Sequence, residues 1–76
     1  MVFKKTREAF VDIMGYEPDE INLESHMYDE LDADSLDMSQ ILLALENAYQ
    51  IEIENEDVAD MDTVSDLVSH IEKLIA

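Results

Sequence analysis

The stretch LDADSLDMSQILLALENAYQ, residues 31–50, decides the fold that this chain is expected to adopt. It begins with short polar residues and continues, without glycine or proline, into an apolar pattern with helical spacing. Asp34 and Ser35 are both good N-cap residues, so we expect a helix that begins at one of them and ends near Gln50. At about 100° per residue, one face collects the apolar residues that should pack on the core: Met38, Ile41, Leu42, Leu45, Ala48 and Tyr49.

Two leucines of the same segment fall outside that face. Leu36 and Leu43 lie one heptad apart on the opposite side of the predicted helix, among Gln40, Glu46 and Asn47. A single exposed leucine is common on protein surfaces and needs no special reason. Two leucines aligned near the start of one helix favour a docking surface for another protein.

The segments on either side predict further helices. Apolar residues near helical spacing stop at Gly15, which predicts a first helix with a left-handed C-cap. Thr63 and Asp66 resemble a capping box, and the apolar residues that follow keep helical spacing to the end of the chain: Val64, Leu67, Val68, Ile71, Leu74 and Ile75. A short helix is expected over Glu56–Met61, between the helix that ends near Gln50 and the last helix.

Residues 16–34 show no sustained period, which indicates a long ordered loop between the first two helices. Scattered apolar residues should fix this loop to the core, with a short turn near residues 18–21: Ile21, Leu23, Met27, Tyr28 and Leu31. The 76 residues are 47% hydrophobic and include one glycine and one proline. These observations predict one all-α domain over residues 1–76, a small four-helix bundle with three longer helices and one short third helix.

The charge is strongly one-sided. Twenty acidic residues oppose four basic ones, for a formal charge of −16, and no lysine or arginine lies between Glu8 and Glu72. Such a chain should be repelled by nucleic acid and by anionic membranes, and should meet basic proteins instead. The absence of cysteine excludes a protein thiol nucleophile, and no apolar run resembles a signal or a membrane span. We therefore expect a cytoplasmic monomer.

Ser35 stands where an irregular loop opens a helix. The first N–H groups of a helix lack intrahelical partners, and together with the macrodipole they favour an anion such as a phosphodiester on this serine. On local physics alone, the simpler interpretation is that Ser35 only caps the helix.

The motif LDADSLD, residues 31–37, resembles the signature of acyl carrier proteins, and residues at the expected downstream offsets extend the resemblance: Leu42, Ala44, Leu45 and Glu46. Length, acidity and helix order are similar over essentially the whole chain. The resemblance implies that Ser35 is esterified with 4′-phosphopantetheine, whose thiol holds a growing acyl chain as a thioester. It also implies a carrier of fatty acid biosynthesis rather than an enzyme.

In that family, phosphopantetheinyl transferase and the enzymes of fatty acid synthesis present basic patches to the start of this helix. By resemblance, the partner-binding residues are Asp34, Leu36, Asp37, Gln40, Leu43 and Glu46. The chain departs from the family where Asp32 replaces a usual glycine, Ser39 a usual apolar residue, and Gln40 and Asn47 a frequent glutamate. One hypothesis is that an attached acyl chain enters between the second and third helices, near Met38, Leu42, Leu45, Met61 and Leu67; a closed core suits the same residues equally well.

Other readings of the same residues are open. Glu30, Asp32 and Asp34 alternate like the start of an EF-hand, but Ser35 and Ile41 occupy positions that need glycine and glutamate, so no metal site is predicted beyond weak divalent binding. A nucleophilic serine assisted by His26 or His70 lacks the glycine-flanked elbow. A polyketide or aminoacyl carrier with the same arm, and an acidic interaction module without an arm, remain as alternatives.

Overall fold

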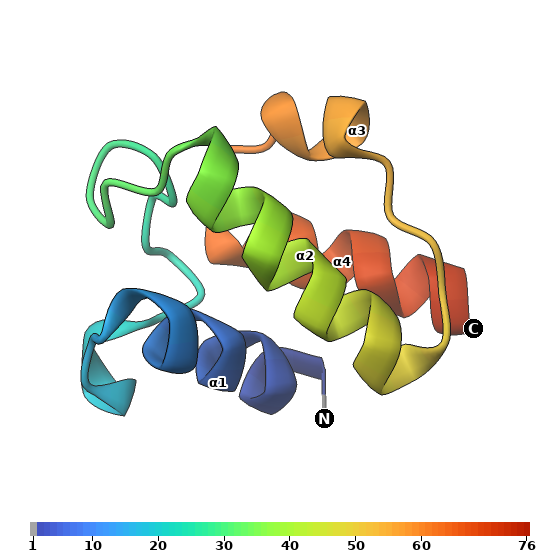
Figure 1. Cartoon of the computed structure of the whole chain (residues 1–76), viewed down its shortest axis with the longest axis horizontal. Coiled ribbons are helices and arrows are strands. Elements are labelled where there is room, and N and C mark those ends of the chain that lie inside the picture. Colours follow the sequence, from blue (N-terminus) through green and yellow to red (C-terminus); the bar gives the residue numbers. More distant parts are fainter. Residues whose placement is uncertain (1) are drawn as a thin grey trace.

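Helix α2 (Ser35–Tyr49) crosses the front of helix α4 (Val64–Ile75) in the computed structural model, which describes residues 2–76 (Figure 1). Helix α1 (Val2–Met14) packs against both of them, and the short helix α3 (Asn55–Ala59) lies near the start of α2. Within the described residues, the only other helical element is the 3-10 turn η1 (Pro18–Glu20). The predicted all-α bundle is confirmed.

The helices end where local chemistry predicts. Gly15 takes a positive φ of 80° directly after α1, as a left-handed C-cap requires. At the start of α4, the Thr63 side chain accepts from the Asp66 N–H, and the Asp66 carboxylate accepts from the N–H of Thr63 at 3.1 Å. Hydrogen bonds from the backbone N–H groups of Thr63 and Asp62 lower the pKa of Asp66.

One core joins the helices and the loop. Its fully buried side chains come from every long element: Phe10, Ile21, Met27, Ile41, Leu42, Leu45, Val64, Leu67 and Ile71. The loop between α1 and α2 is ordered by contacts of its own, because Ile21, Met27 and Leu31 are buried as predicted. Leu23, also expected to fix the loop, is exposed instead.

Two expectations about the helices, those for the core face of α2 and for the bounds of α3, need correction. Ala48 is exposed because it lies at the edge of the apolar arc of α2, and Tyr49 is only half-buried. Leu74 and Ile75 are exposed in the last turn of α4, at the end of the bundle (Figure 1). Helix α3 covers Asn55–Ala59, so the predicted Met61 follows the helix rather than closing it.

The loop is also joined to the start of α4 by backbone hydrogen bonds. Val64 donates to the carbonyl of Ser25 at 3.0 Å, and Ser65 donates to the carbonyl of Leu23 at 2.9 Å. In the other direction, Met27 donates to the carbonyl of Asp62 at 2.8 Å. The first N–H groups of α4, which have no partner within the helix, are therefore satisfied by the chain itself.

Candidate functional site

Ser35 is the first residue of α2 and is exposed. The residue before it caps the helix: Asp34 Oδ1 accepts from the N–H of Asp37 at 2.8 Å, and the N–H of Asp34 donates to Asp37 Oδ2 at 3.3 Å. Because Asp34 supplies the cap, the interpretation of Ser35 as the capping residue is wrong. The Ser35 hydroxyl stands at the helix terminus without that role.

The start of α2 differs from the start of α4 in how its donors are used. At α4, loop carbonyls accept from the first two N–H groups of the helix. Among residues 2–76, no acceptor bonds to the corresponding N–H groups of Ser35 and Leu36 at α2. The positive end of α2 is therefore left to an outside acceptor, and a phosphate on the Ser35 oxygen would lie beside it.

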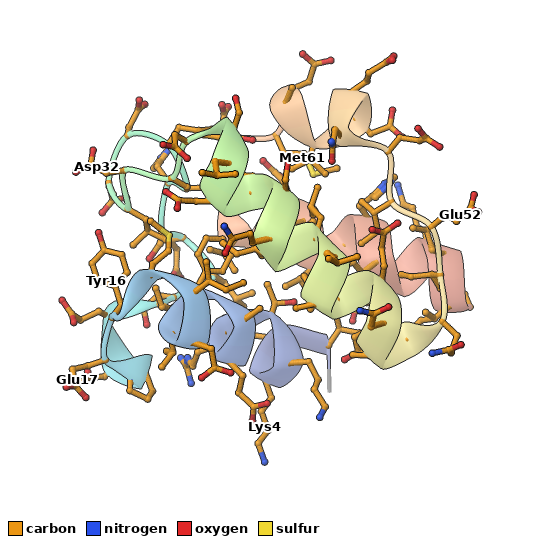
Figure 2. All side chains as sticks on the ribbon, in the orientation of Figure 1. Lys4, Tyr16, Glu17, Asp32, Glu52 and Met61 are labelled. Carbon is orange, nitrogen blue, oxygen red and sulfur yellow. The ribbon has the colours of Figure 1, made fainter. Side chains whose placement is uncertain are left out.

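A pocket of about 510 Å³ opens next to Ser35, between α2 and α3. Its lining comes from the loop, α2 and the α3 segment: Tyr28, Ser35, Met38, Ser39, Leu42, Asn55, Glu56, Val58 and Ala59. Of the residues expected to contact an acyl chain, Met38 and Leu42 line this pocket. Leu45 and Leu67 are buried in the core outside its lining, and Met61 lies beside α3 (Figure 2).

The exposed face of α2 carries the predicted apolar pair. Leu36 is 67% exposed and Leu43 is 58% exposed, and the exposed Gln40 lies between them along the helix. A second hollow of about 390 Å³ lies beside Leu43 and is lined further by Glu46, Asn47, Gln50, Ile51 and Glu52. Leu36, Gln40 and Leu43 thus form one open surface that begins at Ser35.

The acidic residues predicted to bind partners also make hydrogen bonds within the fold. Asp34 and Asp37 form the capping box of α2. Glu46 is half-buried, and its Oε2 accepts from the N–H of Ile53 at 2.9 Å, which joins α2 to the connection before α3. This second contact joins residues seven positions apart through a side chain, so helical spacing gave no sign of it.

The departures from the resembled pattern fall at informative places. Asp32 adopts a positive φ of 58°, in the left-handed region where glycine is favoured, on the loop that leads into α2 (Figure 2). Ser39 is exposed and adds a hydroxyl to the pocket lining.

The other candidate chemistries find little geometric support. Glu30, the first acid of the EF-hand-like run, accepts from the backbone N–H of His26 at 3.0 Å. His70 Nε2 lies 3.9 Å from Asp57, so it faces α3. No group of three or more histidines and acids that could hold a metal ion occurs in residues 2–76, and no helix there is long and apolar enough to cross a membrane.

Comparison with known proteins identifies a matching family and similar bacterial proteins. A family model described as a phosphopantetheine attachment site matches residues 4–71. An acyl carrier protein of Lactococcus lactis subsp. cremoris is 45% identical over 71 residues, which cover 93% of each chain. One from Streptococcus pneumoniae is 44% identical over 72 residues, or 95% of this chain and 93% of that protein.

A solved structure supports the fold alone. The solution structure of the apo doublet acyl carrier protein from prodigiosin biosynthesis matches 96% of this chain with a TM-score of 0.80 at 23% identity. This chain spans 35% of the length of that one. Taken with the exposed serine at the start of α2, the family model and the bacterial relatives lead to one conclusion: this chain belongs to the acyl carrier proteins, and it contains their phosphopantetheine attachment domain.

Proposed function

We propose that Ser35 carries the 4′-phosphopantetheine arm, and that this chain holds growing acyl chains as thioesters and delivers them to the enzymes of fatty acid biosynthesis. The observation that carries the proposal is the exposed Ser35 hydroxyl at a helix terminus capped by Asp34. The free N–H groups there suit the phosphate of the arm.

The residues of the chain fit such a group. The arm would supply the thiol that the sequence lacks, since the chain contains no cysteine. The chain itself would then bind, orient and shield the cargo, and the enzymes that receive it would perform the chemistry. We accordingly regard the chain as a carrier without catalysis of its own, one domain over residues 1–76, acting as a cytoplasmic monomer.

The open surface of α2 is the proposed docking site for these enzymes and for phosphopantetheinyl transferase. Leu36 and Leu43 would enter apolar hollows of a partner, while Asp34, Asp37, Gln40 and Glu46 would face its basic patch. The formal charge of −16 favours such partners through long-range attraction. Glu46 would contribute while it also holds Ile53.

The pocket between α2 and α3 is the proposed resting place of the acyl chain. Met38, Leu42 and Val58 give it apolar walls, and the exposed Ser35 is part of its lining. Methionine adapts to chains of different shape because its side chain is flexible and polarisable.

The first experiment tests the attachment itself. The wild-type protein, incubated with coenzyme A and a phosphopantetheinyl transferase, should gain the mass of one phosphopantetheine by intact mass spectrometry. Ser35→Ala should gain none, and Ser39→Ala, which removes the neighbouring exposed hydroxyl of the same helix, should behave as wild type. An unmodified wild type would favour the interaction module without an arm. A modified Ser35→Ala would show that another residue carries the arm.

A further inference from the structure

Helix α3 forms one wall of the pocket but is weakly attached to the rest of the fold. It has five residues, and its N-cap Glu54 makes no side-chain capping bond. Val58 is its one buried residue. A helix this short gains little stability from its own hydrogen bonds, so its position depends on contacts from other elements.

Two polar contacts reach α3 from other parts of the described chain. The Tyr28 hydroxyl donates to the carbonyl of Val58 at 3.0 Å, across thirty positions of sequence. The second is the His70–Asp57 approach of 3.9 Å, in which the Asp57 side chain is 56% exposed. At 3.9 Å the two side chains are beyond hydrogen-bond distance and the contact is open to solvent, which leaves the tyrosine bond as the stronger of the two.

Tyr28 is placed to act on the pocket directly. Its ring is half-buried and lines the pocket together with Ser35 and Met38 of α2, while its hydroxyl reaches the far wall at Val58. The Val58 carbonyl also accepts from the N–H of Met61 at 3.0 Å, so it lies where α3 ends. The bond from Tyr28 to this carbonyl therefore fixes the C-terminal end of α3. Tyr28 therefore spans the two walls.

We propose that Tyr28 is a positioning residue that holds α3 closed over the pocket and thereby controls how long an acyl chain stays shielded there. This inference rests on the proposed function. The sequence alone identified Tyr28 only as an apolar anchor of the loop.

The hydroxyl is suited to a constant rather than a switched role. Burial raises the pKa of Tyr28 above the ordinary value for tyrosine, so the group remains a hydrogen-bond donor at neutral and mildly alkaline pH. Its position should therefore respond to the cargo and to mutation, not to physiological changes of pH.

The chain supplies a matched control in Tyr16. Its hydroxyl donates to the carbonyl of Leu31 at 2.9 Å, and its ring is also half-buried. Tyr16 lies outside the pocket lining, near the end of α1 (Figure 2). Tyr16→Phe and Tyr28→Phe each remove one hydroxyl that bonds a backbone carbonyl, yet only the second touches α3.

The first measurement needs no arm. Amide hydrogen exchange of residues 55–61 in the unmodified protein should be about twofold to tenfold faster in Tyr28→Phe, the change that follows from losing one hydrogen bond. Tyr16→Phe should leave this segment as in wild type. Equal exchange in the two variants would contradict the role of Tyr28.

The second measurement uses the loaded protein. With an octanoyl thioester on the arm, cleavage by neutral hydroxylamine should be about twofold to tenfold faster in Tyr28→Phe than in wild type or Tyr16→Phe. With an acetyl thioester, too short to fill the pocket, the three proteins should react alike. If Tyr28→Phe only lowered the general stability, cleavage of the octanoyl and the acetyl thioester would both be faster in this variant. That result would overturn the proposal.

A third measurement uses the unmutated chain, in case Tyr28→Phe folds poorly. Octanoyl loading should shift the NMR signals of Tyr28 and Val58 relative to acetyl loading, and those of Tyr16 should stay. Tyr28 signals that are the same with both acyl groups would count against the proposed role of Tyr28. Failure of the wild type to accept an arm would contradict the proposed function alone, because exchange in α3 would still decide the role of Tyr28.

Discussion

Asp32 shows how one residue conflicts with its own backbone. It has a φ of 58°, and the left-handed region costs an L-residue about 1–2 kcal/mol, although aspartate and asparagine enter this region more often than most other residues. The position lies three residues before Ser35, in the loop that leads into α2. The conformation is thus kept by the surrounding loop, where buried Leu31 and Ala33 flank it.

Replacing this residue should reveal the strain. We expect Asp32→Gly to raise the free energy of unfolding by about 0.5–1 kcal/mol, because glycine enters the left-handed region without cost. Asp32→Ala should lower it, since alanine keeps the Cβ atom and enters the left-handed region less readily than aspartate does. Urea denaturation measures the free energy of unfolding of the wild type and of each variant.

A charge effect has to be separated from this backbone effect. Asp32→Asn removes the same negative charge but tolerates a positive φ, so it isolates the contribution of reduced repulsion. Glycine should exceed asparagine in stability. If the glycine, alanine and asparagine variants shift together, backbone strain at this position is not the cause.

Helix α2 shows how one element serves two purposes. One face packs the core through Met38, Ile41 and Leu45, and the other presents Leu36 and Leu43 to solvent. Truncating exposed side chains changes stability little, whereas truncating an anchor in a partner's pocket weakens binding.

Leu36→Ala and Leu43→Ala should therefore separate folding from docking. We expect the free energy of unfolding to stay within about 0.5 kcal/mol of wild type, and the affinity for a phosphopantetheinyl transferase to fall about tenfold. Leu74→Ala is the control, because Leu74 is 42% exposed on a different helix. Calorimetric titration gives the affinities. Equal affinities for all three variants would remove docking from this face of α2.

The elements also show what sequence reasoning could reach. The ends of α1, α2 and α4 were predicted because Gly15, Asp34 and Thr63 act through neighbours within four residues. The exposed place of Ser35 at the start of α2 was expected for the same local reason, whereas its role as the attachment site came from the family resemblance and stays a prediction. Periodicity also found the exposed leucine pair.

The contacts that sequence reasoning missed are long-range ones. The Tyr28 hydroxyl meets Val58 only after the chain has folded, so periodicity could describe that tyrosine only as apolar. The hydrogen bonds from the start of α4 to the carbonyls of Leu23 and Ser25 have the same character. The bounds of α3 were shifted because such a short helix is set by its surroundings more than by its own residues.

At the scale of the molecule, charge and size together matter. The net charge of −16 is held in a body with a radius of gyration of 10.9 Å and extents of 27 × 23 × 19 Å. The Debye length is about 10 Å at 0.1 M salt, so each carboxylate feels many others. This repulsion opposes the compact state, while the same field attracts basic partners from a distance.

Salt should therefore act in opposite directions on stability and on encounter. Raising NaCl from about 20 mM to about 500 mM shortens the Debye length, so the melting temperature should rise while the association rate with a basic phosphopantetheinyl transferase falls. Scanning calorimetry and stopped-flow fluorescence measure the two effects. Mg²⁺ at matched ionic strength serves as a comparison, because only specific divalent binding would raise the melting temperature beyond the effect of NaCl. If salt left the melting temperature unchanged while slowing association, the charge would guide encounter, and repulsion among the carboxylates would not lower the stability of the fold.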